Sequence, residues 1–78
     1  MTAREEVELP GQVVLPGLIN CHGHAAMSLL RGYADDLELH AWLQEHIWPA
    51  ERKFVGPEFV RDGVRLALAE MLRGVTTC

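Results

Sequence analysis

"GLINCHGHAAMSLLRG", residues 17–32, contains a short apolar run that ends in two histidines separated by one glycine. Leu18 and Ile19 lead into this pair and predict a short buried strand, because a half-solvated strand would alternate apolar and polar residues. Successive side chains of a strand point to opposite faces, so His22 and His24 should project to the same side. Two imidazoles on one side provide half of the ligand set of a metal site.

The position of the pair leaves two interpretations open. Gly23 leaves room for the backbone to approach an ion. In α/β barrels the active site is built at the carboxyl ends of the strands, which is where this pair falls. An HxH pattern is short, however, and each histidine could instead only satisfy a hydrogen bond in a loop. The spacing alone does not decide between a metal site and a loop.

Composition narrows the classes of partner. The 78-residue chain has 11 acidic and 7 basic residues and a formal net charge of −4. This balance disfavours nucleic acid and anionic membrane surfaces, since both attract lysine and arginine. No apolar run approaches the length of a membrane span, and the start of the chain lacks the apolar segment of a signal peptide, so a cytoplasmic protein is expected. Cys21 and Cys78 are predicted to be free thiols.

The segments around the histidine pair predict β structure before it and a helix after it. Residues 7–9 and 13–15 flank a turn at Pro10 and Gly11, which predicts a strand, a turn and a second strand. After the histidines, residues 25–30 predict a short helix that ends before Gly32, and an acidic loop follows over residues 33–36.

Two longer helices and a final strand are predicted for the rest of the chain. Apolar side chains recur at three- and four-residue steps over residues 39–48, until Pro49 interrupts the run and begins the next short helix. Pro57 opens a long helix over residues 57–72, with Gly74 as its carboxyl cap. Residues 75–78 are rich in β-branched side chains and predict another strand. Together these segments predict an α/β fold with one β/α unit of a larger parallel barrel or sheet.

The chain closely resembles the amidohydrolase superfamily. The signature "PGLINCHGH" (residues 16–24) identifies the superfamily, and "MSLLRGYADDL" (27–37) with "IWPAE" (47–51) resembles a narrower subgroup. That subgroup contains aminohydrolases that deaminate 5-methylthioadenosine and S-adenosylhomocysteine, and also guanine deaminase-like and triazine-hydrolysing enzymes. The resemblance covers nearly the whole chain and implies the N-terminal fragment of such a protein.

The resemblance implies a fold, a metal and site residues. The fold is a metal-dependent (β/α)8 TIM barrel with a flanking β-sandwich, in which residues 1–16 belong to the sandwich and residues 17–78 to the first, incomplete β/α unit. His22 and His24 match two ligands of one divalent metal, usually zinc. Glu51 matches a glutamate that contacts the ribose hydroxyls of a nucleoside. Without the resemblance, Glu51 is simply an acid in the first turn of a helix, where the dipole favours it.

The implied activity is hydrolytic deamination of adenosine derivatives by a full-length protein, with the fragment alone inactive. The other metal ligands and the acid/base group would lie beyond Cys78. The partner is then a small nucleoside, and a homo-oligomer stays open for the complete protein. Two alternatives remain: a related aminohydrolase or chlorohydrolase acting on guanine or a triazine, and a chain without catalysis, which is either a truncated product or a small domain that docks to a partner.

Three other side chains are assigned structural roles. Arg31 is expected to pair with Asp35 or Asp36 in the acidic loop. Trp48 lies in an apolar helical stripe and is expected to pack in the core. Cys21 precedes the first histidine and should point to the opposite side of the strand, into packing contacts.

Overall fold

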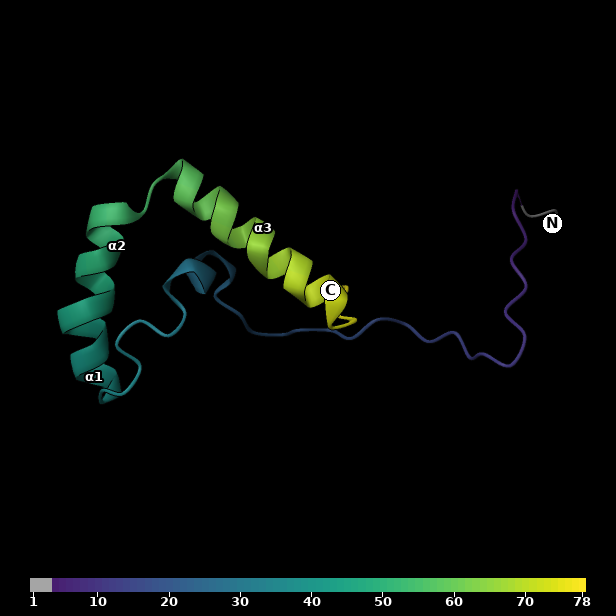
Figure 1. Ribbon diagram of the computed structural model, residues 1–78, viewed down its shortest axis with the longest axis horizontal. Helices are drawn as coiled ribbons and strands as arrows, with labels where there is room; N and C mark the ends of the chain where they lie inside the picture. Colours follow the sequence, from purple (N-terminus) through teal and green to yellow (C-terminus); the bar gives the residue numbers. More distant parts are fainter. Residues whose placement is uncertain (1–3) are drawn as a thin grey trace.

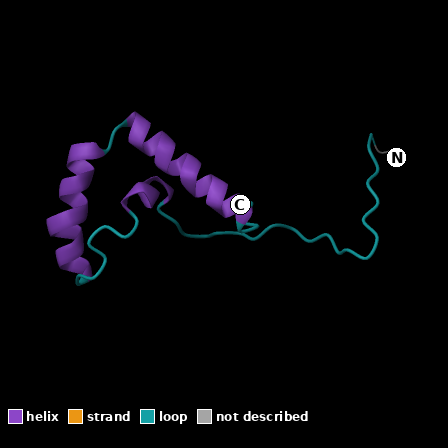
Figure 2. Cartoon of the chain, in the orientation of Figure 1, coloured by secondary structure: helices purple, strands orange, loops and turns teal. Residues whose placement is uncertain are grey.

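The computed structural model describes residues 4–78 as helices joined by loops (Figures 1 and 2). In chain order the elements are the 3₁₀ helix η1 (Ala25–Leu30), the α-helix α1 (Leu39–Ala41), the π-helix η2 (Trp42–Ile47), and the α-helices α2 (Trp48–Phe54) and α3 (Pro57–Arg73). The elements α1, η2 and α2 follow one another without a break and form one helical rod. The rod meets α3 at an angle, with the turn at residues 55–56 (Figure 1).

Capping residues fix the ends of α3 and the start of α1, close to the positions predicted from the sequence. Pro57 lies in the first turn of α3, where its missing N–H costs no hydrogen bond, and Gly56 before it is extended. Gly74 caps the carboxyl end, and its backbone N–H donates to the carbonyl of Glu70 at 2.9 Å. At the start of α1, the side chain of Glu38 accepts hydrogen bonds from two backbone N–H groups. The predicted long helix and its glycine cap are confirmed.

Pro49 lies in the first turn of α2 and does not break the helical rod. A proline inside a helix removes one backbone hydrogen bond, and its ring collides with the carbonyl four residues earlier, here that of Glu45. The π-helix η2 ends directly before this region, at Ile47. A wider turn at that place relieves the collision. The predicted start of a short helix at Pro49 is confirmed, while the interruption takes the form of a change of helical pitch.

The two segments predicted as strands next to η1 and α3 lie side by side in parallel. Leu18 forms a parallel bridge with Thr76. The hydrogen bonds between the segments run from the N–H of Leu18 to the carbonyl of Val75 (2.7 Å), from Thr77 to Leu18 (2.9 Å) and from Asn20 to Cys78 (2.7 Å). Gly17 lies so close to Thr77 that a Cβ atom there would overlap its side chain. Within residues 4–78 the pairing extends no further, so this bridge does not become a strand.

Of the strand, turn and strand predicted at the start of the chain, the structure contains only the turn. The N–H of Gln12 donates to the carbonyl of Leu9 at 3.2 Å, and Gly11 has a φ of +72°, which glycine adopts without strain. The flanking residues form no strand and run away from the helices (Figure 1). Val13 is 83% exposed. Residues 1–3, the first part of the segment assigned to a β-sandwich, lie outside the described residues.

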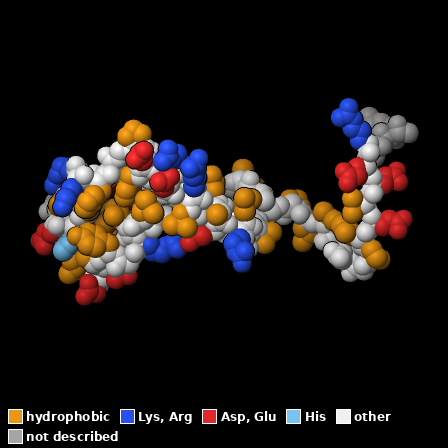
Figure 3. Space-filling view, turned by 45° about the horizontal axis from the view of Figure 1, so that its top comes forward, with side chains coloured by type: hydrophobic (Ala, Val, Ile, Leu, Met, Phe, Trp, Pro, Cys, Tyr) orange, Lys and Arg blue, Asp and Glu red, His pale blue; other side chains and the backbone are white. Residues whose placement is uncertain are grey.

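The chain buries little of its apolar surface. Its radius of gyration is 18.7 Å, against about 11.5 Å for a compact chain of this length. Its accessible surface is 6979 Å², against about 4,700 Å² for a folded protein of this mass. Hydrophobic side chains lie open along both the helices and the extended segment (Figure 3). The described residues therefore lack the core of an independent domain.

The small buried set lies in the helices. The buried apolar side chains are Ile47, Ala50 and Ala67, and Gly63 of α3 is also buried. Trp48 is 43% exposed, so the expected core position is wrong, because within residues 4–78 no second layer covers that side of the rod. None of the helices within residues 4–78 combines the length and the apolar composition needed to cross a membrane.

Candidate metal centre

His22 and His24 turn their imidazole rings toward each other at the end of the extended segment. Their Nε2 atoms lie 3.2 Å apart, and the ring planes meet at 60° with centroids 5.1 Å apart. Two nitrogen ligands held about 2.0–2.1 Å from one zinc ion at a tetrahedral angle lie about 3.3–3.4 Å from each other. The pair therefore fits two ligands of one divalent ion. The same separation also fits a hydrogen bond between two neutral rings.

Short-range contacts set the turn that brings the two rings together. The side-chain Oδ1 of Asn20 accepts a hydrogen bond from the backbone N–H of His22 at 3.1 Å, which is an Asx turn. The carbonyl of His24 accepts from the N–H of Met27 at 2.9 Å, because His24 is the N-cap residue of η1. The role of Asn20 was not foreseen, although an asparagine two residues before a turn is a recognised signal.

Gly23 has close neighbours on the side where a side chain would stand. A Cβ atom there would lie 3.2 Å from the side-chain amide nitrogen of Asn20 and 4.0 Å from the terminal carbon of Met71 in α3. The open face of the glycine is thus directed at Asn20 and α3. The glycine lets the turn pack against this helix.

No third metal ligand joins the pair within residues 4–78. No group of three or more histidine, cysteine, aspartate or glutamate side chains lies close enough together there to hold an ion. Cys21 and Cys78 are free thiols, as expected, and both are exposed. The expected packing of Cys21 is wrong, because the strand that would have turned it inward does not form. The pair thus offers two nitrogen donors, half the number that a tetrahedral ion requires.

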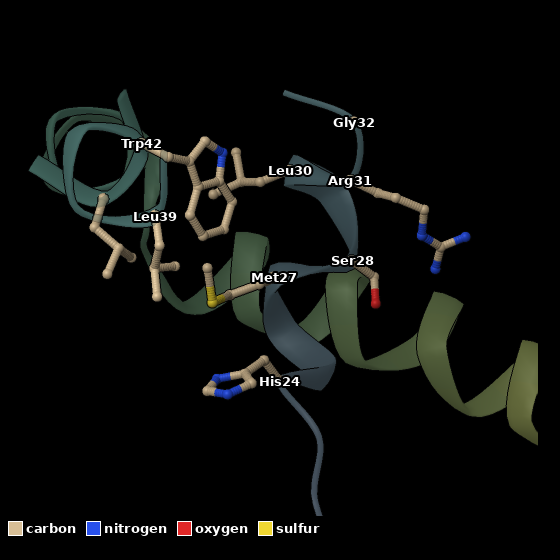
Figure 4. Close-up of a pocket in the computed structure, with 9 residues that line it drawn as sticks. His24, Met27, Ser28, Leu30, Arg31, Gly32, Leu39 and Trp42 are labelled. Carbon is tan, nitrogen blue, oxygen red and sulfur yellow. The ribbon is translucent and has the colours of Figure 1, made fainter. Parts of the chain in front are cut away.

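An apolar groove of about 520 Å³ begins beside His24 (Figure 4). It lies between η1 and the helical rod. In Figure 4 the side chains of Met27, Leu30 and Trp42 project into this space, whereas the guanidinium of Arg31 points away from it. The residues that line the groove are His24, Met27, Ser28, Leu30, Arg31, Gly32, Leu39, Trp42 and Leu43.

Trp42 is the tryptophan that faces the groove. Its indole N–H donates to the backbone carbonyl of Tyr33 at 2.8 Å, which fixes the ring against the acidic loop. Sequence reasoning assigned Trp48 to the core and did not single out Trp42, since both belong to the same apolar helical stripe. The hydrogen bond to Tyr33 is a tertiary feature that the stripe does not reveal.

Glu51 stands apart from this groove. It is half-buried in the first turn of α2, after Pro49, and is not one of the residues that line the groove. An acid at this place interacts favourably with the helix dipole whatever else it does. The structure brings His22 and His24 together and places Glu51 on α2, outside the groove lining.

Arg31 pairs with α3 instead of with the acidic loop. Its Nη1 and Nη2 atoms donate to Oε1 and Oε2 of Glu70 at 3.0 and 2.6 Å. The expected pairing with Asp35 or Asp36 is wrong, because the end of η1 directs the side chain across to α3. The hydrogen bonds from Arg31 hold the pKa of Glu70 below its ordinary value, and Glu70 in turn raises the pKa of Arg31.

Acid should weaken this ion pair. Because the pKa of Glu70 is lowered from 4.5, its contribution to stability is complete above that value and is lost as the pH falls through the lowered pKa. The effect should be small, since the two side chains are 63% and 44% exposed. Melting curves of the wild-type and Glu70→Gln full-length proteins check this. Their difference at about pH 7 should shrink below about pH 4.5, and a constant difference would contradict the assignment.

The comparisons with known proteins place the chain in a class. The amidohydrolase family model matches residues 13–78, and the chain belongs to the amidohydrolase family. Members of this family are generally metal-dependent, and membership implies a TIM-barrel fold at full length.

Within this family, the chain is most informatively compared with individual deaminases. The chain is 66% identical over 77 residues to a 5-methylthioadenosine/S-adenosylhomocysteine deaminase of Teredinibacter turnerae, and 63% identical over 75 residues to one of Saccharophagus degradans. It is 54% identical over 71 residues to a 5'-deoxyadenosine deaminase of Methanosarcina mazei. These alignments cover 99%, 96% and 91% of the chain but only 17%, 17% and 16% of the relatives. The predicted resemblance to these deaminases is confirmed, and the chain spans about a sixth of their length.

Proposed function

We propose that the full-length protein containing these residues is a metal-dependent hydrolase that removes the amino group of adenosine derivatives, with 5-methylthioadenosine and S-adenosylhomocysteine as substrates. The observation that carries the proposal is the 3.2 Å approach of His22 and His24. It occurs in a chain that is 66% identical to a protein bearing that activity in its name.

The two histidines are assigned as ligands of one divalent ion. Zinc is the first choice, because imidazole nitrogens at this spacing suit its tetrahedral coordination. When bound, such an ion lowers the pKa of water enough to make hydroxide available near neutral pH. Asn20 and the start of η1 hold His22 and His24 in place. The remaining ligands and the proton-transfer group are expected from outside this chain, so the 78 residues alone should be inactive.

The groove beside His24 is assigned to the apolar part of the substrate. Its volume of about 520 Å³ lies within the range of small-molecule sites. The indole of Trp42 offers a flat apolar surface on which a purine can stack. Deamination requires the ring amine next to the ion, and His24 belongs both to the ligand pair and to the groove wall. This shared residue supports placing the base in the groove.

The domain assignment follows from the same proposal. Residues 17–78 form the first β/α unit of the barrel and residues 1–16 part of a flanking β-sandwich. The parallel bridge between Leu18 and Thr76 supports the first assignment, since neighbouring barrel strands run parallel. The cytoplasmic location and the homo-oligomeric assembly stay predictions.

Glu51 is assigned to the ribose hydroxyls, because a carboxylate accepts hydrogen bonds from two neighbouring hydroxyl groups. In the full-length protein, Glu51→Gln should lower kcat/KM for the nucleosides by at least about 10-fold and leave any activity on free bases nearly unchanged, since a lost charged hydrogen bond costs about 1.5–3 kcal/mol. Ammonia release measures both activities. Glu58→Gln is the control, because Glu58 is also an acid in the first turn of a helix, α3.

Equal effects of the two substitutions would contradict the ribose assignment and leave Glu51 with its helix-dipole role. Guanine belongs in the same ammonia assay, whereas a chlorinated triazine is followed by chloride release, because its hydrolysis displaces chloride and not ammonia. A higher kcat/KM for either of these than for the adenosine derivatives would overturn the proposed substrate class.

A further inference from the structure

Helix α3 supports the segment that carries the two histidines. The segment from Gly23 to Arg31 touches α3 at its two ends and in its middle. The contacting residues of α3 are Gly63, Glu70 and Met71, and their spacings of seven and eight residues place them on one face of the helix. Along the segment, Gly23 packs near Met71, Ala26 against Gly63, and Arg31 pairs with Glu70.

The contact at Gly63 fixes the distance between η1 and α3. Gly63 is buried, and a Cβ atom there would overlap the backbone carbonyl of Ala26 and lie 3.0 Å from its carbonyl carbon. Backbone therefore packs directly on backbone at this point. Such a contact sets how closely the two helices approach, but a smooth glycine surface does little to prevent η1 from sliding along α3.

The Arg31–Glu70 pair supplies the missing constraint. The two terminal guanidinium nitrogens each donate to one carboxylate oxygen, at 3.0 and 2.6 Å, and this paired geometry fixes direction as well as distance. Arg31 directly follows η1, and His24 is the N-cap residue at its other end. A shift of Arg31 along α3 would be transmitted through this short helix to His24.

We propose that Glu70 is a positioning residue for the histidine pair. It contacts neither imidazole, and it acts through Arg31 by holding η1 at the place on α3 where the Nε2 atoms of His22 and His24 lie 3.2 Å apart. The inference rests on the proposed function, in which these atoms bind one ion. It adds a residue of α3 to the support of that site.

Zinc affinity of the full-length protein tests this inference. The dissociation constant is measured by competition with a chromogenic chelator for the wild type, Glu70→Gln, Arg31→Gln and the double variant. Residues that orient a metal ligand directly change affinity by about 10–100-fold, and Glu70 acts through one further residue, so a loss of about 3–10-fold is expected. Because the two residues act as one unit, the double variant should lose no more than either single variant.

Asp62→Asn is the matched control. Asp62 also forms an exposed ion pair on α3, with Arg61 at 3.1 Å, and this pair lies within α3 itself. Its zinc affinity should equal that of the wild type. An unchanged affinity of Glu70→Gln, a loss equal to that of Asp62→Asn, or additive losses in the double variant would each overturn the positioning role while the proposed function stands. Absence of zinc binding by the wild type would overturn both.

Discussion

Replacing His24 by alanine in the full-length protein should weaken zinc binding by more than about 100-fold and remove the deaminase activity. Loss of a residue that only orients a metal ligand lowers metal affinity by about 10–100-fold. Loss of a ligand itself should therefore lower the affinity by more than this. The fold should survive, because His24 caps η1 through its backbone and no side-chain hydrogen bond contributes to that cap. Zinc content after dialysis and ammonia release measure the two effects.

His40→Ala is the control for this substitution. His40 is exposed, lies in α1 and has its ring nitrogen 2.9 Å from the side chain of Gln44. The variant should keep its zinc and its activity. If His24→Ala also retained zinc at wild-type affinity, the hydrogen-bonded interpretation of the histidine pair would replace the metal site.

Gly63→Ala should lower the stability of the protein strongly, although it adds only one methyl group. The added methyl group would overlap the backbone carbonyl of Ala26, and backbone cannot rotate away as a long side chain can. Overpacking of this kind costs about 1–3 kcal/mol. The expected result is a clear fall in the melting temperature of the full-length protein, accompanied by weaker zinc binding, because η1 must move away from α3.

Gly56→Ala provides the comparison. No atom lies within 4 Å of the place of its Cβ, and its φ of −151° is open to any residue. The weaker helix cap and the stiffer unfolded chain each change stability by less than about 1 kcal/mol, in opposite directions. Gly56→Ala should therefore melt near the wild type. If Gly63→Ala melted at the same temperature, the close contact between η1 and α3 would not exist in solution.

The sequence predicted the elements that depend on local signals. The turn at Pro10 and Gly11, the short helix at η1, and the long helix from Pro57 to its cap at Gly74 all follow from residues within a few positions of each other. Strands differ, because they exist only through pairing with distant segments. The structure reduces the predicted pairing to the bridge of Leu18 with Thr76, since the described residues provide too few neighbours for a sheet.

The candidate site shows the same division. The approach of His22 and His24 was predicted from strand geometry, yet the rings meet through a local turn that Asn20 stabilises. The partner of Arg31 lies 39 residues away, and no local pattern indicates it. The groove-facing tryptophan could not be chosen from a stripe that contains two of them. Long-range contacts thus account for what sequence reasoning missed.

Ammonia release by metal-stripped and zinc-reloaded full-length protein tests the central claim most directly. With 5-methylthioadenosine as substrate, the account predicts no activity after chelation, recovery on addition of zinc to the wild type, and no recovery in the His22→Ala protein. Undiminished release by the stripped protein, or recovery without His22, would contradict the assignment of this histidine pair to a catalytic metal centre.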